Sequence, residues 1–154
     1  MSAPTNADVR VALIAYLKGA QPLLDWYAGD NPQGEIISGP DVGEWQFAGP
    51  VADYAIRIQD NGVAPEDMWP KPGCPHYTAF FTVWVWTAGV GTTMAHSLIG
   101  VVEEVLRDCV SVKEVYGPRK VCLQDIVWLG RGEAVPSREG WSMPTRFRAT
   151  VKYV

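Results

Sequence analysis

The chain has 154 residues, of which 47% are apolar and 19% are charged, and its net charge at pH 7 is -4. This size and composition predict one compact domain with its own core. The acidic balance argues against a free-standing nucleic-acid binder, because such domains carry an excess of lysine and arginine. No apolar run is long enough to span a bilayer and no signal peptide is visible, so we expect a soluble, cytoplasmically made protein with no membrane partner.

The N-terminal part of the chain predicts two helices. Residues 1–7 are expected to form a flexible tail, and apolar residues then recur at helical spacing up to Gly19. Pro22 suits the first turn of a second helix that closes near Asp30. Trp26 in this second helix is interpreted as part of a lid over a sheet, with an anchor for a partner as the alternative.

Glycine and proline interrupt the next stretch, so residues 31–50 predict only short strands, around Ile36 and over 44–48. A better strand is expected over 52–59, where apolar and polar residues alternate. Residues 60–76 are expected to be a long loop.

The segment from Tyr77 to Thr87 is the strongest strand prediction, because nearly all of it is aromatic or β-branched. Its period of two places Trp84 and Trp86 on one face with Phe80, and the other face is also mainly apolar. A strand that is apolar on both faces belongs at the centre of a covered sheet. With few helices available, we expect a neighbouring subunit to cover one face.

A helix is expected from Thr92 or Thr93 to about Asp108. The predicted buried stripe consists of Met94, Leu98, Val101, Val102, Val105 and Cys109. On the opposite side lie His96, Gly100, Glu103 and Arg107, which we interpret as a solvated face.

The last third of the chain predicts a connection or edge strand over 111–116, a strand over 120–129 and a long loop over 130–144. The strand over 120–129 is expected to place Val121, Leu123, Val127 and Leu129 on one face, with Cys122, Ile126 and Trp128 on the other.

In the final strand, over 145–154, apolar residues alternate with a basic stripe of Arg146, Arg148 and Lys152. This stripe is either a solvated face paired with nearby carboxylates or a contact for an acidic surface on an adjacent subunit or ring.

The predicted fold is therefore α+β, a single domain with an antiparallel or mixed sheet of four to five strands and helices packed on one face.

Catalytic and ligand-binding motifs are not apparent in the sequence. It has no phosphate-binding glycine loop, no nucleophile elbow and no zinc-binding helix motif. Three cysteines at wide spacing indicate reduced thiols, and the neighbouring Cys74 and His76 lack the further residues that would complete a metal site or catalytic set. We expect no enzyme activity, no cofactor and no metal.

Four segments resemble the tail terminator, or tail completion, proteins of long-tailed bacteriophages. They are Val9-Arg10-Val11-Ala12-Leu13-Ile14-Ala15-Tyr16-Leu17, the strand from Tyr77 to Thr87, Val101-Val102-Glu103-Glu104-Val105-Leu106, and Thr145-Arg146-Phe147-Arg148-Ala149-Thr150-Val151. The likeness lies in the order and character of these segments. It implies a virion protein that forms a hexameric ring, caps the tail tube, stops tube polymerisation and joins the tail to the head.

The partners implied by the resemblance are other copies of the chain, the tail tube protein and a head-completion or connector protein, with genomic DNA only passing through the channel. We expect the subunit or ring interface to include Trp84, Trp86, Trp128, Arg146, Arg148, Lys152 and Trp69. Two alternatives remain. One is another ring protein of the phage neck or tail, and the other is a small ligand-binding or lyase-type α+β domain with a pocket lined by Trp84, Trp86 and Trp128.

Overall fold

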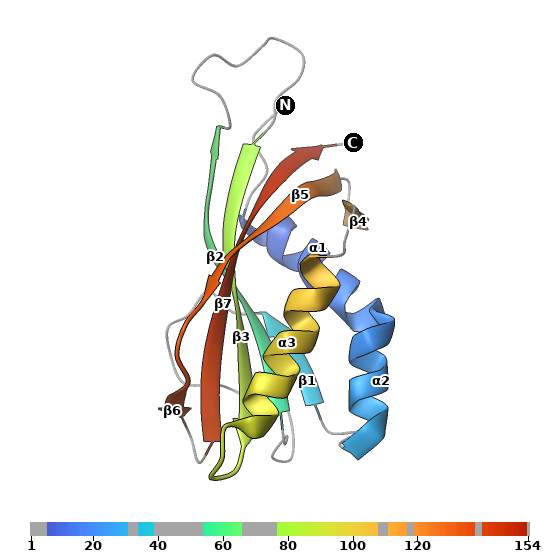
Figure 1. Cartoon of the computed structure of the whole chain (residues 1–154). Coiled ribbons are helices and arrows are strands. Elements are labelled where there is room, and N and C mark those ends of the chain that lie inside the picture. The colour runs from blue at the N-terminus through green and yellow to red at the C-terminus, as the bar shows by residue number, and fades with distance from the viewer. Residues whose placement is uncertain are drawn as a thin grey trace.

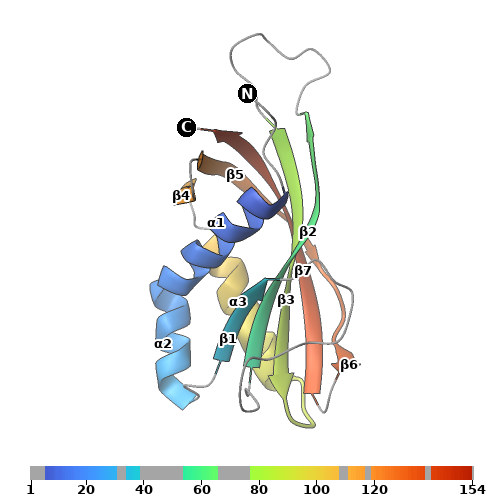
Figure 2. The same ribbon diagram turned by 180° about the vertical axis from the view of Figure 1, so that it is seen from behind.

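The computed structural model describes residues 6–30, 34–38, 54–65, 77–107, 111–116, 119–137 and 140–153. In chain order, the elements are α1 (Asn6–Gly19), α2 (Gln21–Asp30), β1 (Gly34–Ser38), β2 (Tyr54–Pro65), β3 (Tyr77–Ala88), α3 (Thr93–Arg107), β4 (Ser111–Tyr116), β5 (Arg119–Arg131), β6 (Val135–Ser137) and β7 (Gly140–Tyr153). The three helices lie on one face of one sheet (Figures 1 and 2), which confirms the α+β prediction.

The sheet contains seven strands in the order β1-β2-β3-β7-β5-β4, and β6 also pairs with β7. Strand β1 runs parallel to β2, and every other pairing is antiparallel, so the sheet is mixed as predicted. It has more strands than the four to five expected. The difference arises because the short strand expected around Ile36 and the connection or edge strand expected over 111–116 both join the sheet, as β1 and β4, and because β6 is a strand that the sequence did not predict.

The prediction of a long loop over 130–144 is wrong. Strand β5 continues to Arg131, β6 follows, and β7 already begins at Gly140. Pro144 is tolerated within β7 because it lies between the parts that pair with β5 and β6, where its missing N–H removes no ladder bond. Its carbonyl accepts a 2.9 Å hydrogen bond from the backbone N–H of Gly132.

Part of the loop expected over 60–76 is also strand, since β2 extends to Pro65. Residues 66–76, including Trp69, Cys74 and His76, and the strand expected over 44–48 lie outside the described residues. In the part of the chain that is described, no helix combines the length and apolarity needed to cross a bilayer.

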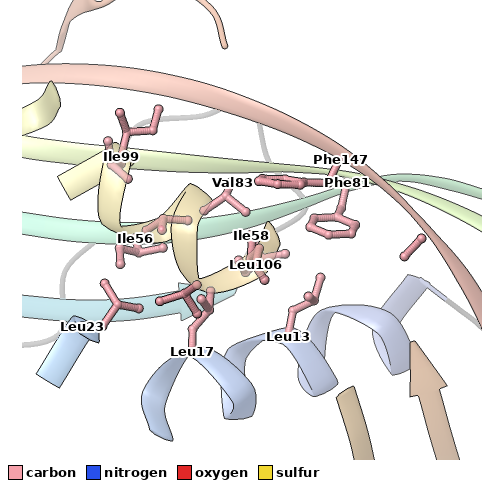
Figure 3. Packing of buried hydrophobic residues seen from close by; sticks show 14 of the residues in the cluster. Leu13, Leu17, Leu23, Ile56, Ile58, Phe81, Val83, Ile99, Leu106 and Phe147 are labelled. Atoms are coloured by element: carbon pink, nitrogen blue, oxygen red, sulfur yellow. The ribbon is translucent and has the colours of Figure 1, made fainter. Parts of the chain in front are cut away.

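The core fills the space between the helices and the sheet (Figure 3). Leu13 and Leu17 belong to this core, where α1 packs against β2, and the rings of Phe81 and Phe147 stack with centroids 5.4 Å apart. Each fully buried side chain of this size contributes about 1.5–3 kcal/mol through removal of apolar surface from water. The alternation predicted for the central and final strands is confirmed by the buried Ala79, Phe81, Val83 and Val85, and by Phe147, Ala149 and Val151.

Helix α2 closes one side of the helical layer. The Trp26 ring packs edge-on against Tyr54 of β2, with centroids 5.0 Å apart, and its Nε1 donates a 3.1 Å hydrogen bond to Ser97 of α3. Trp26 therefore covers the sheet at β2, in agreement with its interpretation as part of a lid.

Helix α3 is rotated relative to the sequence prediction. Its buried residues are Ala95, Leu98, Ile99, Val102, Glu103, Val105 and Leu106. Met94 is exposed instead, and Cys109 lies outside the described residues. The rotation arises because α3 packs against both the sheet and α2, so its apolar surface is wider than one stripe. Glu103, interpreted from sequence as solvated, is carried inward.

Candidate functional site

The candidate site is the face of the sheet opposite the three helices, called here the helix-free face. Register places Trp84 and Trp86 of β3 on this face, because the intervening Val83 and Val85 point into the core. The side chains of Arg146 and Arg148 lie on the same face, with cross-strand neighbours Thr82 and Phe80.

Trp84 is a half-buried, fixed ring on this face. Its Nε1 donates a 2.7 Å hydrogen bond to Oε1 of Gln59, and the guanidinium carbon of Arg57 lies 5.9 Å from the ring centroid. Both partners belong to β2. The indole is therefore held by side chains of the neighbouring strand while part of its surface stays open.

Trp86 is almost fully buried, with 2% of its surface exposed, and it packs with Ala55 in a small cluster separate from the main core. Gly140 lies against it, since an added Cβ there would collide with the carbonyl oxygen of Thr87 and lie 2.9 Å from the Trp86 ring. Trp86 therefore serves as structural support beneath this face.

Arg146 and Arg148 are both exposed. Arg148 lies in a cross-strand row between Phe80 and Val127, each of which is 39% exposed. Among the described residues, neither arginine has an ion-pair partner. One interpretation of the basic stripe was that nearby carboxylates neutralise it. Within the described part of the chain, no carboxylate pairs with Arg146 or Arg148. Lys152 belongs to the same strand, opposite Cys122, but its side chain lies outside the description.

Trp128 lies on the helix side of the sheet, opposite Phe147, and not with Trp84 and Trp86. A bulge in β5 reverses the predicted alternation: Asp125 has a φ of 51°, and the register shifts between Gln124 and Val127. The three tryptophans therefore do not line one pocket, which removes the structural basis of the ligand-binding alternative.

The bulge brings Trp128 beside α3. Its Nε1 donates a 2.9 Å hydrogen bond to Oγ1 of Thr145, and the guanidinium carbon of Arg107 lies 5.2 Å from its ring centroid. Such a cation–π contact is worth about 0.5–1 kcal/mol at an exposed position.

The sequence reasoning missed an ion pair next to Trp128. Arg131 of β5 donates two hydrogen bonds to Glu103 of α3, from Nε at 2.7 Å and from Nη2 at 2.5 Å. The hydrogen bonds from Arg131 raise the pKa of its guanidinium, an effect that partial burial opposes. No local pattern joins two residues that lie on different elements. The available signal was that Ile99 and Leu106, which lie at helical spacing from Glu103, are apolar.

An open depression of about 450 Å³ lies over this pair, lined by Gly100, Glu103, Glu104, Arg107 and Arg131. Within the described ranges, no group of three histidine, cysteine or carboxylate side chains is placed to hold a metal ion. Cys122 is buried and His96 is exposed on α3.

The sequence matches no protein-family model and no curated protein. The fold, however, matches a solved chain described as belonging to the virion of the native gene transfer agent particle. The two chains are 18% identical, the TM-score is 0.66, and the match covers 97% of this chain and 98% of the other. A second solved protein is 16% identical over 96% of this chain and 93% of its own, and its TM-score of 0.49 is too low to establish a shared fold. The likeness establishes a shared fold over nearly the whole of both chains.

Proposed function

We propose that this chain is a structural subunit of a virion and that it acts there as a tail terminator. The observation that carries the proposal is the likeness in fold to a virion chain, which covers 97% of this chain and 98% of the other. The role proposed is mechanical and non-enzymatic.

The composition of the helix-free face supports contact with another protein. Trp84, Phe80 and Val127 are combined there with Arg146 and Arg148, and interface centres are typically enriched in aromatic residues and arginine. The net charge of the chain is -4, so two arginines without an ion-pair partner in the described part of the chain are locally unusual. They favour an acidic surface as the partner, where charge sets the orientation of docking more than its strength.

In the proposed mechanism, copies of the chain form a closed ring, hexameric as in the family it resembles, at the end of the tail tube. The ring occupies the surface to which the next tube subunit would bind, so elongation stops. Its opposite side offers a new surface to the head-completion or connector protein. The genomic DNA passes through the central channel, and the chain resides in the neck or tail of the virion.

Tube growth in the presence of the purified chain tests this proposal. Tube subunits are allowed to polymerise with and without the chain, and tube lengths are measured in negative-stain images. We expect tubes of restricted length, each with a ring at one end, and a ring-sized mass by light scattering. Tubes that grow equally long in both samples and carry no end density would refute the terminator role.

A head-completion, connector or tube protein is the second candidate, because the same fold likeness to a virion chain supports any ring protein of the neck or tail. The two roles predict different locations. A terminator binds the end of a preformed tube, a connector binds heads without tubes, and a tube protein polymerises on its own. Pull-down of this chain with separated heads and tubes distinguishes the three.

A further inference from the structure

We propose that one lateral edge of the sheet, together with the adjoining flank of α3, is the contact for a second copy of this chain, which docks there with its β1 edge and its α2 helix. This inference deepens the proposed function by assigning the surfaces that join neighbouring subunits in the ring. The docking edge is defined as Ile126–Arg131 of β5, and the flank as the part of α3 around Arg107.

The docking edge has an unpaired side among the described residues. Strand β4 covers β5 only from Arg119 to Gln124, and the remaining part of β5 pairs on its inner side with β7. Pro136 interrupts the neighbouring strand β6 and lacks an N–H, so the β5 segment is the part of this side that can donate and accept ladder hydrogen bonds. An open strand of this kind is a template for pairing with another chain.

Most of the exposed side chains along this edge are apolar, with the charged Arg131 at its end. Three consecutive residues, Val127, Trp128 and Leu129, are 39%, 39% and 50% exposed, and Val135 of β6 is 44% exposed. Clusters of exposed apolar residues on one side of a soluble domain indicate an interaction surface, whereas single ones do not.

The opposite side of the sheet ends in β1, which pairs only with β2 among the described strands. Residue pairing across β2 and β3 aligns β1 with residues 141–145 of β7. The docking edge pairs with residues 145–148 of the same strand, so the two edges are offset along the strand direction. A tilt of the strands from the ring axis supplies the stagger of a few residues that aligns them, as in other closed sheets. Because β1 runs parallel to β7 and β5 antiparallel to it, copies related by rotation about an axis along the strands would pair β1 with β5 in the antiparallel direction.

The same arrangement of copies also brings the helices of neighbouring copies together. Helix α2 lies beside β1, on the side of the molecule away from β6 (Figures 1 and 2). It exposes Leu24, 41% accessible, and Asp25, whose carboxylate accepts a 2.7 Å hydrogen bond from Gln21. When β1 of one copy meets β5 of the next, α2 is brought toward the open depression on the flank of α3.

Charge complementarity supports this occupant. On the flank, Arg107 lies over Trp128 and has no ion-pair partner among the described residues. On α2, Asp25 likewise has no cationic partner there, and residues 21–38 contain three acidic residues and no basic one. The geometry thus assigns Asp25 of one copy to Arg107 of the next.

A charge swap tests the assignment. Arg107→Glu and Asp25→Arg should each weaken self-association at least about tenfold, because like charges placed opposite each other are costly at an interface. The double variant should recover most of the loss. Sedimentation of the full chain over a range of concentrations measures the association, and circular dichroism checks that each variant is folded.

A second pair of variants tests the edge itself. Leu129→Glu should abolish association, whereas Val90→Glu introduces the same charge at a fully exposed apolar residue in the turn before α3 and should leave it unchanged. A wild-type chain that stays monomeric at every concentration, unchanged association in Leu129→Glu, or a double charge variant no better than the single ones would overturn the inference. Failure of the proposed function is distinguishable, because a chain that associates through this edge but does not restrict tube length keeps the inference and refutes the terminator role.

Discussion

Removing the guanidinium of Arg131 should destabilise the fold measurably, although a third of this side chain is in contact with water. Its partner Glu103 is 4% exposed and accepts both hydrogen bonds of the pair. Arg131→Met leaves a buried carboxylate without a partner, at a cost of about 1–3 kcal/mol. Because the side chain of Arg131 is 36% exposed, water can partly replace it and the lower half of that range is expected.

The matching variants separate the loss of the pair from other effects. Glu103→Leu leaves Arg131 free to reach water and should cost less than Arg131→Met, and the double variant should be more stable than Arg131→Met alone. For a domain of this size, the expected loss lowers Tm by roughly 2–8 °C. Thermal and urea unfolding followed by circular dichroism measure it. If Arg131→Met and Glu103→Leu both leave stability unchanged, Glu103 is solvated as the sequence suggested and the geometry of this pair is wrong.

Three further predictions concern the helix-free face and the bulge. Reversing Arg146 and Arg148 to Glu should change the free energy of unfolding by less than about 0.5 kcal/mol, because neither has an ion-pair partner among the described residues. The same double variant should reduce ring formation or tube capping. If it still forms rings and tails of uniform length, this face is only solvated. Gly140→Ala should lower the free energy of unfolding by about 1–3 kcal/mol, because the added Cβ collides with β3. Gly100→Ala in α3 meets open space and should raise it by about 0.5–1 kcal/mol. Equal melting temperatures of the two variants would contradict this. Asp125→Val should cost about 1–2 kcal/mol, since a β-branched residue disfavours the left-handed backbone at this position, and unchanged unfolding would place the bulge elsewhere.

The long strands could be predicted because their patterns are local. In β3 and β7, alternating side chains are buried against the helices, and a period of two over a long segment leaves one consistent assignment of faces. The placement of Trp84, Arg146 and Arg148 followed from this alternation. Their role at an interface stays a prediction, because register fixes a direction but does not supply a partner.

The features that sequence reasoning missed depend on contacts between distant segments. Nothing in the sequence near Glu103 of α3 reveals its partner Arg131, which lies on strand β5. The helical period also does not fix which face of α3 is buried, because the helix can be rotated by one residue without losing that period. The short strand β6 pairs because its long neighbour β7 offers it an edge, so its own residues carry a weak signal, whereas β4 lies where the sequence does predict a connection or edge strand. Glycine and proline over 130–144 suggested a loop where they accommodate a change of strand partner.

One residue in β5 decides how the two candidate surfaces are divided. Without the bulge at Asp125, strict alternation from Leu123 would turn Trp128 to the helix-free face and Val127 toward α3. With it, Trp128 supports Arg107 beside the docking edge, and Val127 joins Arg148 and Phe80 on the helix-free face. A ring subunit needs separate surfaces for its lateral neighbours and for its other partners. The bulge allows a single strand to contribute to both, so substitutions at this position should affect self-association and binding at the helix-free face together. Changes confined to Arg107 should affect self-association, whereas changes confined to Arg148 should affect binding at the helix-free face.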